Sequence, residues 1–267
     1  VIGSMDDLDA AELNEFISFN EKYYNPNNAV LVVTGDINIE ETKSLIMDYF
    51  GTIENNAGPN LKLDIVEPAI EETRYATEYD TNIQIPAYIF SYITPKSVEK
   101  DAYTLDYISS ILTGGNSSRM YKRMVDKDKV ALQVLAFNQA NQDYGTYTMG
   151  AIIKGEPDWD MLKVTMDQEI KKLQTELISE KEYQKLQNQF ETNYVQANST
   201  VEGIASSLAK YYMLQGDTNR INKQLDIYRT ITKEDIKRVA NTYLNPNQRV
   251  EIKYLSGTDP ATDATKQ

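Results

Sequence analysis

The chain has 267 residues, of which 40 are acidic and 27 basic, which gives a formal net charge of −13. Such an acidic chain is a poor partner for nucleic acid, and no apolar run approaches the roughly 18 residues of a membrane-spanning helix. Histidine and cysteine are both absent, which excludes the usual zinc sites as well as Ser-His-Asp and Cys-His catalysis.

The first fifty residues predict a helix, a strand and a second helix. Helical spacing of apolar residues covers 10–24, with Asp9 as a candidate N-cap. An unbroken Val/Leu run at 29–34 predicts a buried strand, and 40–50 predicts a helix that ends at Gly51. Three elements do not make a domain, so we expect this fragment to complete a sheet whose other strands lie elsewhere.

The rest of the chain predicts strands first, then several helices and a returning strand, which is typical of an α+β fold with a mixed or antiparallel sheet against a layer of helices. The predicted strands are 72–80, 87–93, 131–137, 146–153 and 250–257, with the third and fourth paired as a hairpin. The predicted helices are 100–112 before Gly114-Gly115, 118–126, a helix from Asp158 or Asp160 to Leu177, 180–198, 201–215, 221–228, and 233–243 with a Thr232/Asp235 capping box.

One pattern occurs twice along the chain. An amphipathic helix, a Tyr-x-Asn-Pro-Asn stop and a strand ending in glycine appear around Pro26 and again around Pro246, 220 positions later. An Asn-Pro pair ends a helix because the residue before proline avoids the α region. We therefore predict the tail of one repeat unit at 1–54, a linker at 55–70 and a second unit at 71–267.

Two segments resemble the insulinase (pitrilysin-like) family of zinc metallopeptidases. Tyr24-Asn25-Pro26-Asn27-Asn28 followed by a Val/Leu strand and Gly35-Asp36 is similar to the late part of the family's catalytic domain. Leu112-Thr113-Gly114-Gly115-Asn116-Ser117-Ser118-Arg119-Met120-Tyr121 is similar to a Gly-Gly-x-Ser-Ser-Arg-Leu segment of the second domain. The order and spacing of these motifs cover most of the chain.

The resemblance implies a clamshell of homologous domains around a chamber, in which a peptide is cut by a zinc-activated water. The zinc motif of the family, H-x-x-E-H with a later Glu, is absent here. We therefore expect the chamber-forming, substrate-binding part of a zinc metalloendopeptidase, inactive alone, with zinc only in the parent enzyme. The alternatives are a non-catalytic binding or structural subunit of a peptidase complex, and a free-standing peptide-binding module.

The residues that the resemblance marks for substrate contact follow the two glycines. In many relatives the second domain lends an Arg and a Tyr to substrate; the corresponding places here hold Val125 and Leu132, neither of which can donate a hydrogen bond. The nearby polar candidates for substrate binding are Asn116, Ser117, Ser118, Arg119, Tyr121 and Arg123. No catalytic or metal-binding residue is expected in this chain.

Structural interpretations compete with these assignments. The glycine pair is typical of a helix C-cap, with Ser117 or Ser118 as the next N-cap. Arg119 and Arg123 could instead form a solvated face paired with Asp126. The charge-rich run at 171–191 predicts a surface helix pair stabilised by charges three and four apart.

The expected partners are a peptide substrate and an upstream catalytic domain or partner subunit. Because the predicted strand at 29–34 lacks partners, we also expect either a swapped or symmetric homodimer or poor order in the first sixty or so residues. The lack of cysteine fits a reducing cytosol and a bacterial periplasm or cell envelope alike, so the compartment stays open.

Overall fold

The computed structural model describes residues 4–55 and 66–260. They form two compact units, which we call the helical unit (4–55 with 195–221) and the sheet unit (66–194 with 222–260). Most of the predicted linker at 55–70 lies outside the described residues, because 56–65 are not among them. The boundaries at 54 and 71 stay predictions.

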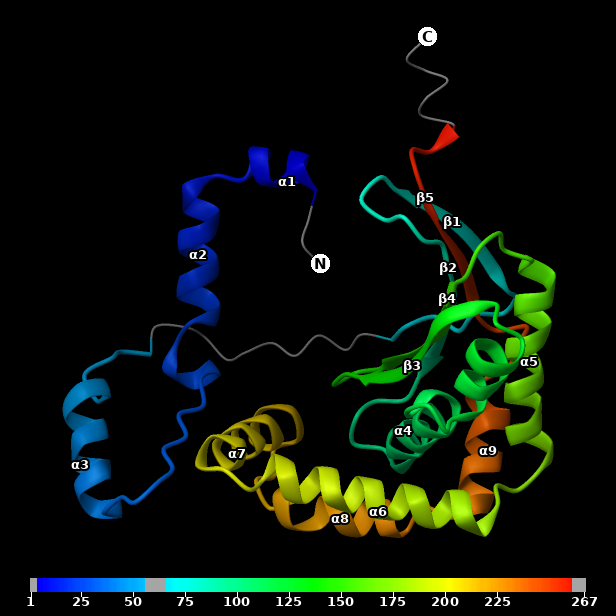
Figure 1. The fold of residues 1–267 in the computed structure, drawn as a ribbon. Helices are drawn as coiled ribbons and strands as arrows, with labels where there is room; N and C mark the ends of the chain where they lie inside the picture. Colours follow the sequence, from blue (N-terminus) through cyan, green and yellow to red (C-terminus); the bar gives the residue numbers. More distant parts are fainter. Residues whose placement is uncertain (1–3, 56–65, 261–267) are drawn as a thin grey trace. The chain divides into compact units, whose positions relative to one another are not determined.

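The sheet unit is built on one five-stranded mixed sheet, in the order β1-β5-β2-β4-β3 (Figure 1). β1 and β5 are parallel, and the other neighbouring pairs are antiparallel. The predicted hairpin is confirmed, since β3 and β4 pair directly. The strands are β1 (Arg74–Asp80), β2 (Ala87–Thr94), β3 (Ala131–Ala140), β4 (Gly145–Ile153) and β5 (Val250–Ser256).

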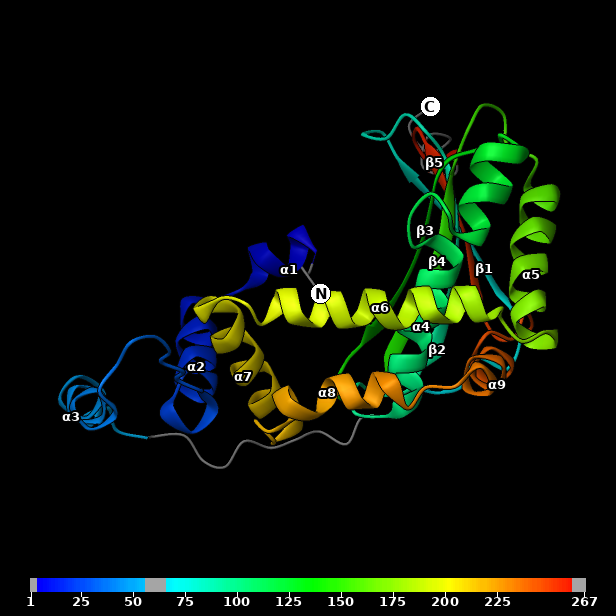
Figure 2. The same ribbon diagram turned by 60° about the horizontal axis from the view of Figure 1, so that its bottom comes forward.

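Helices cover one face of this sheet. Figures 1 and 2 show α4, α5 and α9 as a layer against the strands, and β2 alternates between fully buried and half-buried residues as a strand with one covered face should. The core lies between these layers. The helices of this part are α4 (Lys100–Thr113), the π-helical turn η2 (Tyr121–Lys127), α5 (Trp159–Thr175), α6 (Glu180–Ala197), α8 (Arg220–Arg229) and α9 (Lys233–Tyr243).

Local sequence signals set the ends of these helices. Gly114 closes α4, with its N–H donating to the Ser110 carbonyl at 2.9 Å. Asp158 caps α5 by accepting from the Met161 N–H. The Thr232/Asp235 capping box of α9 is present as predicted. The α+β prediction is therefore confirmed down to individual caps.

A buried guanidinium ties the last strand to the helix layer. Arg249 is fully buried and donates to Asp167 on α5, to Glu251 on β5 and to the Tyr92 hydroxyl on β2. It also lies over the Phe90 ring, with the guanidinium carbon 3.7 Å from the ring centre. Buried charges are tolerated when paired and hydrogen-bonded in this way.

The helical unit contains α1 (Met5–Ala10), α2 (Leu13–Tyr23), the 3₁₀ turn η1 (Pro26–Asn28), α3 (Ile39–Phe50) and α7 (Val201–Gln215). The helix predicted over 10–24 is confirmed as the shorter α2, but Asp9 is not its cap, because Asp9 lies inside α1. Ser4 caps that helix, and Glu12 begins α2. The helix predicted at 40–50 is confirmed as α3, which ends at Gly51.

The strand predicted at 29–34 is wrong as well. Among the described residues, this segment pairs with no strand. It instead borders a shallow groove with α7, where Leu208 and Tyr212 lie opposite the valines. The Thr34 hydroxyl donates to the Val201 carbonyl at 3.1 Å. A strand needs a hydrogen-bonding neighbour, and the described residues offer none here.

The two Asn-Pro turns nevertheless have the same geometry. Asn25 Oδ1 accepts from the Asn27 N–H at 3.1 Å, and Asn245 Oδ1 accepts from the Asn247 N–H at 3.0 Å. Both turns follow a helix, α2 in one case and α9 in the other. After the second turn the chain enters β5, whereas after the first it stays unpaired.

Candidate functional site

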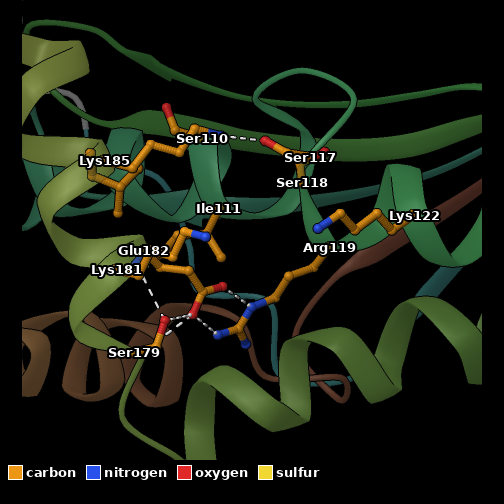
Figure 3. Close-up of a pocket in the computed structure, with 11 residues that line it drawn as sticks. Ser110, Ile111, Ser117, Ser118, Arg119, Lys122, Ser179, Lys181, Glu182 and Lys185 are labelled. Carbon is orange, nitrogen blue, oxygen red and sulfur yellow. Dashed lines mark hydrogen bonds and ion pairs between the residues drawn. The ribbon is translucent and has the colours of Figure 1, made fainter.

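The segment after α4 borders a cavity of about 450 Å³ in the sheet unit (Figure 3). One wall comes from the end of α4 and the residues that follow it, and the other from the first turns of α6. The lining is rich in hydroxyl and basic groups: Ser110, Ile111, Ser117, Ser118, Arg119, Lys122, Ser179, Lys181, Glu182, Lys185 and Leu186.

An ion pair joins the two walls. The Arg119 guanidinium donates from Nε and Nη2 to the two carboxylate oxygens of Glu182, at 2.9 and 3.1 Å, which is the two-pronged geometry that suits this pair. Hydrogen bonding from Arg119 lowers the pKa of Glu182 to about 2, against the opposing effect of burial. Glu182 also accepts from the Ser179 N–H. This carboxylate is therefore charged and already engaged at neutral pH.

The remaining cations of the cavity have no such partner. Figure 3 places Lys122 on one wall and Lys181 and Lys185 on α6 opposite. Within the described part of the chain none of the three forms an ion pair with a carboxylate. Lys185 donates instead to the Ser117 hydroxyl at 2.7 Å. Outside the Arg119–Glu182 pair, the cavity thus carries positive charge only.

Ser118 is the least satisfied group of the cavity. The residue is 3% exposed, and its hydroxyl has no hydrogen-bond partner in the part of the chain that the structure describes. Two α-helical residues, Arg119 and Met120, precede η2, so the helical segment starts directly after Ser118, whose carbonyl accepts from the Lys122 N–H at 3.0 Å. Ser118 therefore holds the predicted N-cap position through its backbone, without a side-chain bond among the described residues, and the C-cap interpretation of the glycines holds for Gly114.

The other sequence candidates, Asn116, Tyr121 and Arg123, are not among the residues that line the cavity. Asn116 is exposed, and Tyr121 is half-buried against the core. Arg123 pairs with Asp128 rather than with the expected Asp126. Arg119 does not pair with Asp126 either, because it reaches Glu182.

Two positions that the family resemblance marks for substrate contact carry no polar group here. Val125 packs against the core, whereas Leu132 on β3 is exposed. Sequence reasoning did not find the α6 wall. Its residues lie more than 60 positions from Arg119, and the run at 171–191 gave only a surface helix pattern. Within that run, Glu182 pairs across the cavity and not with a charge three or four positions away. The predicted spacing does occur between Glu169 and Lys172 on α5, which form a pair three apart.

The donor set of this chain does not fit a zinc ion. The whole sequence has no histidine and no cysteine, which are the ligands that zinc sites in proteins rely on. In residues 4–55 and 66–260, no three Asp or Glu side chains gather into a group that could hold a metal ion. Over the same ranges, no helix has the length and hydropathy for a bilayer crossing.

Several proteins similar to this chain are named zinc proteases. The family model described as "Peptidase M16 inactive domain" matches residues 10–190. The "Zinc protease PqqE" of Helicobacter pylori is 25% identical over 254 residues, covering 94% of this chain and 56% of that protein. An uncharacterized zinc protease of Rickettsia felis is 22% identical over 248 residues, covering 90% of this chain and 57% of that protein.

Solved structures share the fold. A crystal structure of a protease from Helicobacter pylori matches with a TM-score of 0.87 at 24% identity, covering 95% of this chain and 61% of that chain. The chain spans about half the length of the curated relatives it matches, 56% and 57% for the two above.

Proposed function

The chain belongs to the peptidase M16 inactive-domain family, and from this premise we propose that it is the chamber-forming, substrate-binding half of a zinc-dependent endopeptidase that cleaves peptides. In this proposal the zinc and its ligands come from a catalytic domain upstream in the same protein or from a partner subunit. This chain contributes the walls that hold the peptide and supplies no group that activates water.

Two observations together support the proposal. Relatives named zinc proteases align with 90% or more of this chain, yet the chain has no histidine and no cysteine. A zinc hydrolase needs such ligands to lower the pKa of its bound water. If the parent protein is a zinc protease, its metal site therefore lies outside this sequence.

The surface of the helical unit supports a catalytic-type domain as the partner. Neither α2 nor α3 contains a buried residue, although both carry an apolar face. Phe16 is 57% exposed, and Leu31 in the unpaired segment is 56% exposed. Exposed apolar faces of this extent mark interaction surfaces. Strands of a catalytic domain beside 29–34 would cover them, and a second copy of this chain is the competing occupant.

We further propose that Asn116, Ser117, Ser118, Arg119, Tyr121 and Arg123 form a segment that contacts substrate. Asn116 and Ser117 are exposed enough to do so directly, while the ion pairs of Arg119 and Arg123 fix the backbone around them. Alanine at each position in the intact enzyme should raise KM for peptide. Unchanged peptide cleavage in all six variants would dispose of this assignment.

Reconstitution tests the main proposal. The purified chain should not hydrolyse an unstructured fluorogenic peptide, and adding the catalytic part should give hydrolysis that a chelator abolishes. Chelator-sensitive hydrolysis by the chain alone would contradict it. The alternative, a non-catalytic subunit of a peptidase complex, predicts that the parent reading frame has no H-x-x-E-H at a position roughly 100 to 170 residues before Val1.

A further inference from the structure

We propose that the cavity between the end of α4 and the start of α6 is a binding site for a tetrahedral oxyanion of the phosphate class. This inference does not need the chamber role, because phosphate binding is measured on the chain itself and peptide cleavage on the intact enzyme. If phosphate does not bind, the chamber role is not contradicted, and if the chamber role fails, the phosphate site is not contradicted.

The cavity is positively charged, whereas the protein as a whole is negatively charged. Four basic side chains and one acidic side chain line it, in a chain with 40 acidic and 27 basic residues. Glu182 is neutralised by Arg119 through both carboxylate oxygens. Lys122, Lys181 and Lys185 are left to attract an anion, and no carboxylate within the described residues pairs with them.

Ser118 is a second feature of the cavity wall, with a buried hydroxyl that has no partner among the described residues. An unsatisfied polar atom that is buried in a protein is costly and normally finds a partner. Ser118 Oγ has none in residues 4–55 and 66–260, although the residue lines the cavity and is 3% exposed. This oxygen has almost no accessible surface, so an oxyanion in the cavity can accept its hydrogen bond only when the hydroxyl turns towards the cavity. Ser117, which already accepts from Lys185, would stand beside it as a further hydroxyl donor.

The geometry of the donors favours phosphate over a carboxylate. The planar fork of a guanidinium matches a carboxylate, and here that fork is filled by Glu182. What remains are ammonium groups, which act as point charges, and hydroxyl groups on two facing walls (Figure 3). A phosphate has oxygens in several directions and up to two negative charges, so it can accept from both walls at once.

Isothermal titration calorimetry of the full chain with inorganic phosphate, at fixed ionic strength, tests the site. We expect saturable binding at one site. Lys185→Met and Lys122→Met should each weaken it by about tenfold, the scale of one lost charge-assisted hydrogen bond. Ser118→Ala should weaken it by about threefold, near the lower end of what one hydrogen bond contributes. Lys171→Met is the matched control, because Lys171 is an exposed lysine of α5 away from the cavity, and should bind as the unchanged chain does.

Titrations with other compounds identify which anion the site prefers. Phosphoserine binding at least as tightly as inorganic phosphate would identify a phosphomonoester, and weaker binding would identify the free ion; either supports the site. Succinate or an acidic peptide binding as tightly as phosphate would overturn the assignment to phosphate. Absence of saturable phosphate binding, or equal weakening in Lys171→Met, would overturn the site itself. Lys122, Lys171 and Lys185 are exposed, and Ser118→Ala removes a single oxygen atom, so circular dichroism should show every variant folded.

Discussion

Arg249 Nη2 donates to Asp167 Oδ2 at 3.0 Å, which joins the last strand of the sheet to α5. The two residues lie 82 positions apart, so the bond exists only in the folded sheet unit. The same guanidinium donates to Glu251. Although burial disfavours its charged form, hydrogen bonds from Lys163, Tyr88 and Arg249 hold the pKa of Glu251 below its ordinary value.

Removing this guanidinium should destabilise the sheet unit. Arg249→Met leaves Asp167 and the buried Glu251 without their shared partner, and breaking a buried ion pair costs about 3–5 kcal/mol. Urea unfolding measures the change. Arg229→Met is the matched control, because the Arg229–Glu191 pair is about half exposed on both sides and such pairs contribute at most about 1 kcal/mol. Equal effects of the two substitutions would show that the network contributes no more than a surface pair.

The Arg119–Glu182 pair should make stability depend on acid pH. Glu182 has a folded pKa of about 2, below its ordinary 4.5, so its contribution is present above pH 4.5 and is lost as pH falls towards 2. Because the pair is partly exposed and solvent screens it, protonation of Glu182 should lower the free energy of unfolding by about 1–2 kcal/mol. Unfolding free energies at pH 6 and pH 3 should differ less in Glu182→Gln than in the unchanged chain. An identical pH dependence would contradict the low pKa.

The cap of α9 should contribute measurably to stability. Thr232 Oγ1 accepts from the Asp235 N–H at 3.0 Å, and loss of an N-cap costs about 1 kcal/mol. Thr232→Ala should lower the free energy of unfolding by that amount, and Thr232→Ser should restore most of it because the hydroxyl is retained. A serine variant as unstable as the alanine variant would assign the effect to the lost methyl group instead.

Zinc should not stabilise this chain. Its sequence offers no imidazole or thiolate, and a bound metal would raise the unfolding midpoint by mass action. The midpoint should therefore be the same after dialysis against a chelator and after addition of equimolar zinc. Tight stoichiometric zinc binding with a raised midpoint would show a site built from carboxylates alone.

The apolar face of the helical unit should be needed for assembly with the catalytic part. Phe16→Asp places a charge on an exposed face, so we expect little change in the unfolding of the isolated chain but loss of co-purification with the catalytic part. Leu177→Asp is the control, since Leu177 is an exposed apolar residue of the sheet unit. Retained assembly in Phe16→Asp would place the partner elsewhere.

The sequence by itself determined the elements of the sheet unit. Period-two alternation marked β3 and β4, Gly114 marked the end of α4, and Thr232 with Asp235 marked the start of α9. These signals are local, because a cap or a strand face depends on residues a few positions apart. The absence of histidine and cysteine likewise fixed in advance that this chain offers no usual zinc ligand.

Only the tertiary structure decided the pairings over long distances. The sequence could not show that Glu182 would meet Arg119 or that Asp167 would meet Arg249, since side chains more than 60 positions apart are brought together by packing. It also predicted a strand at 29–34 from apolar residues alone. A strand forms only where a neighbour supplies hydrogen bonds. After its Asn-Pro turn β5 has such neighbours, while the described residues supply none to 29–34.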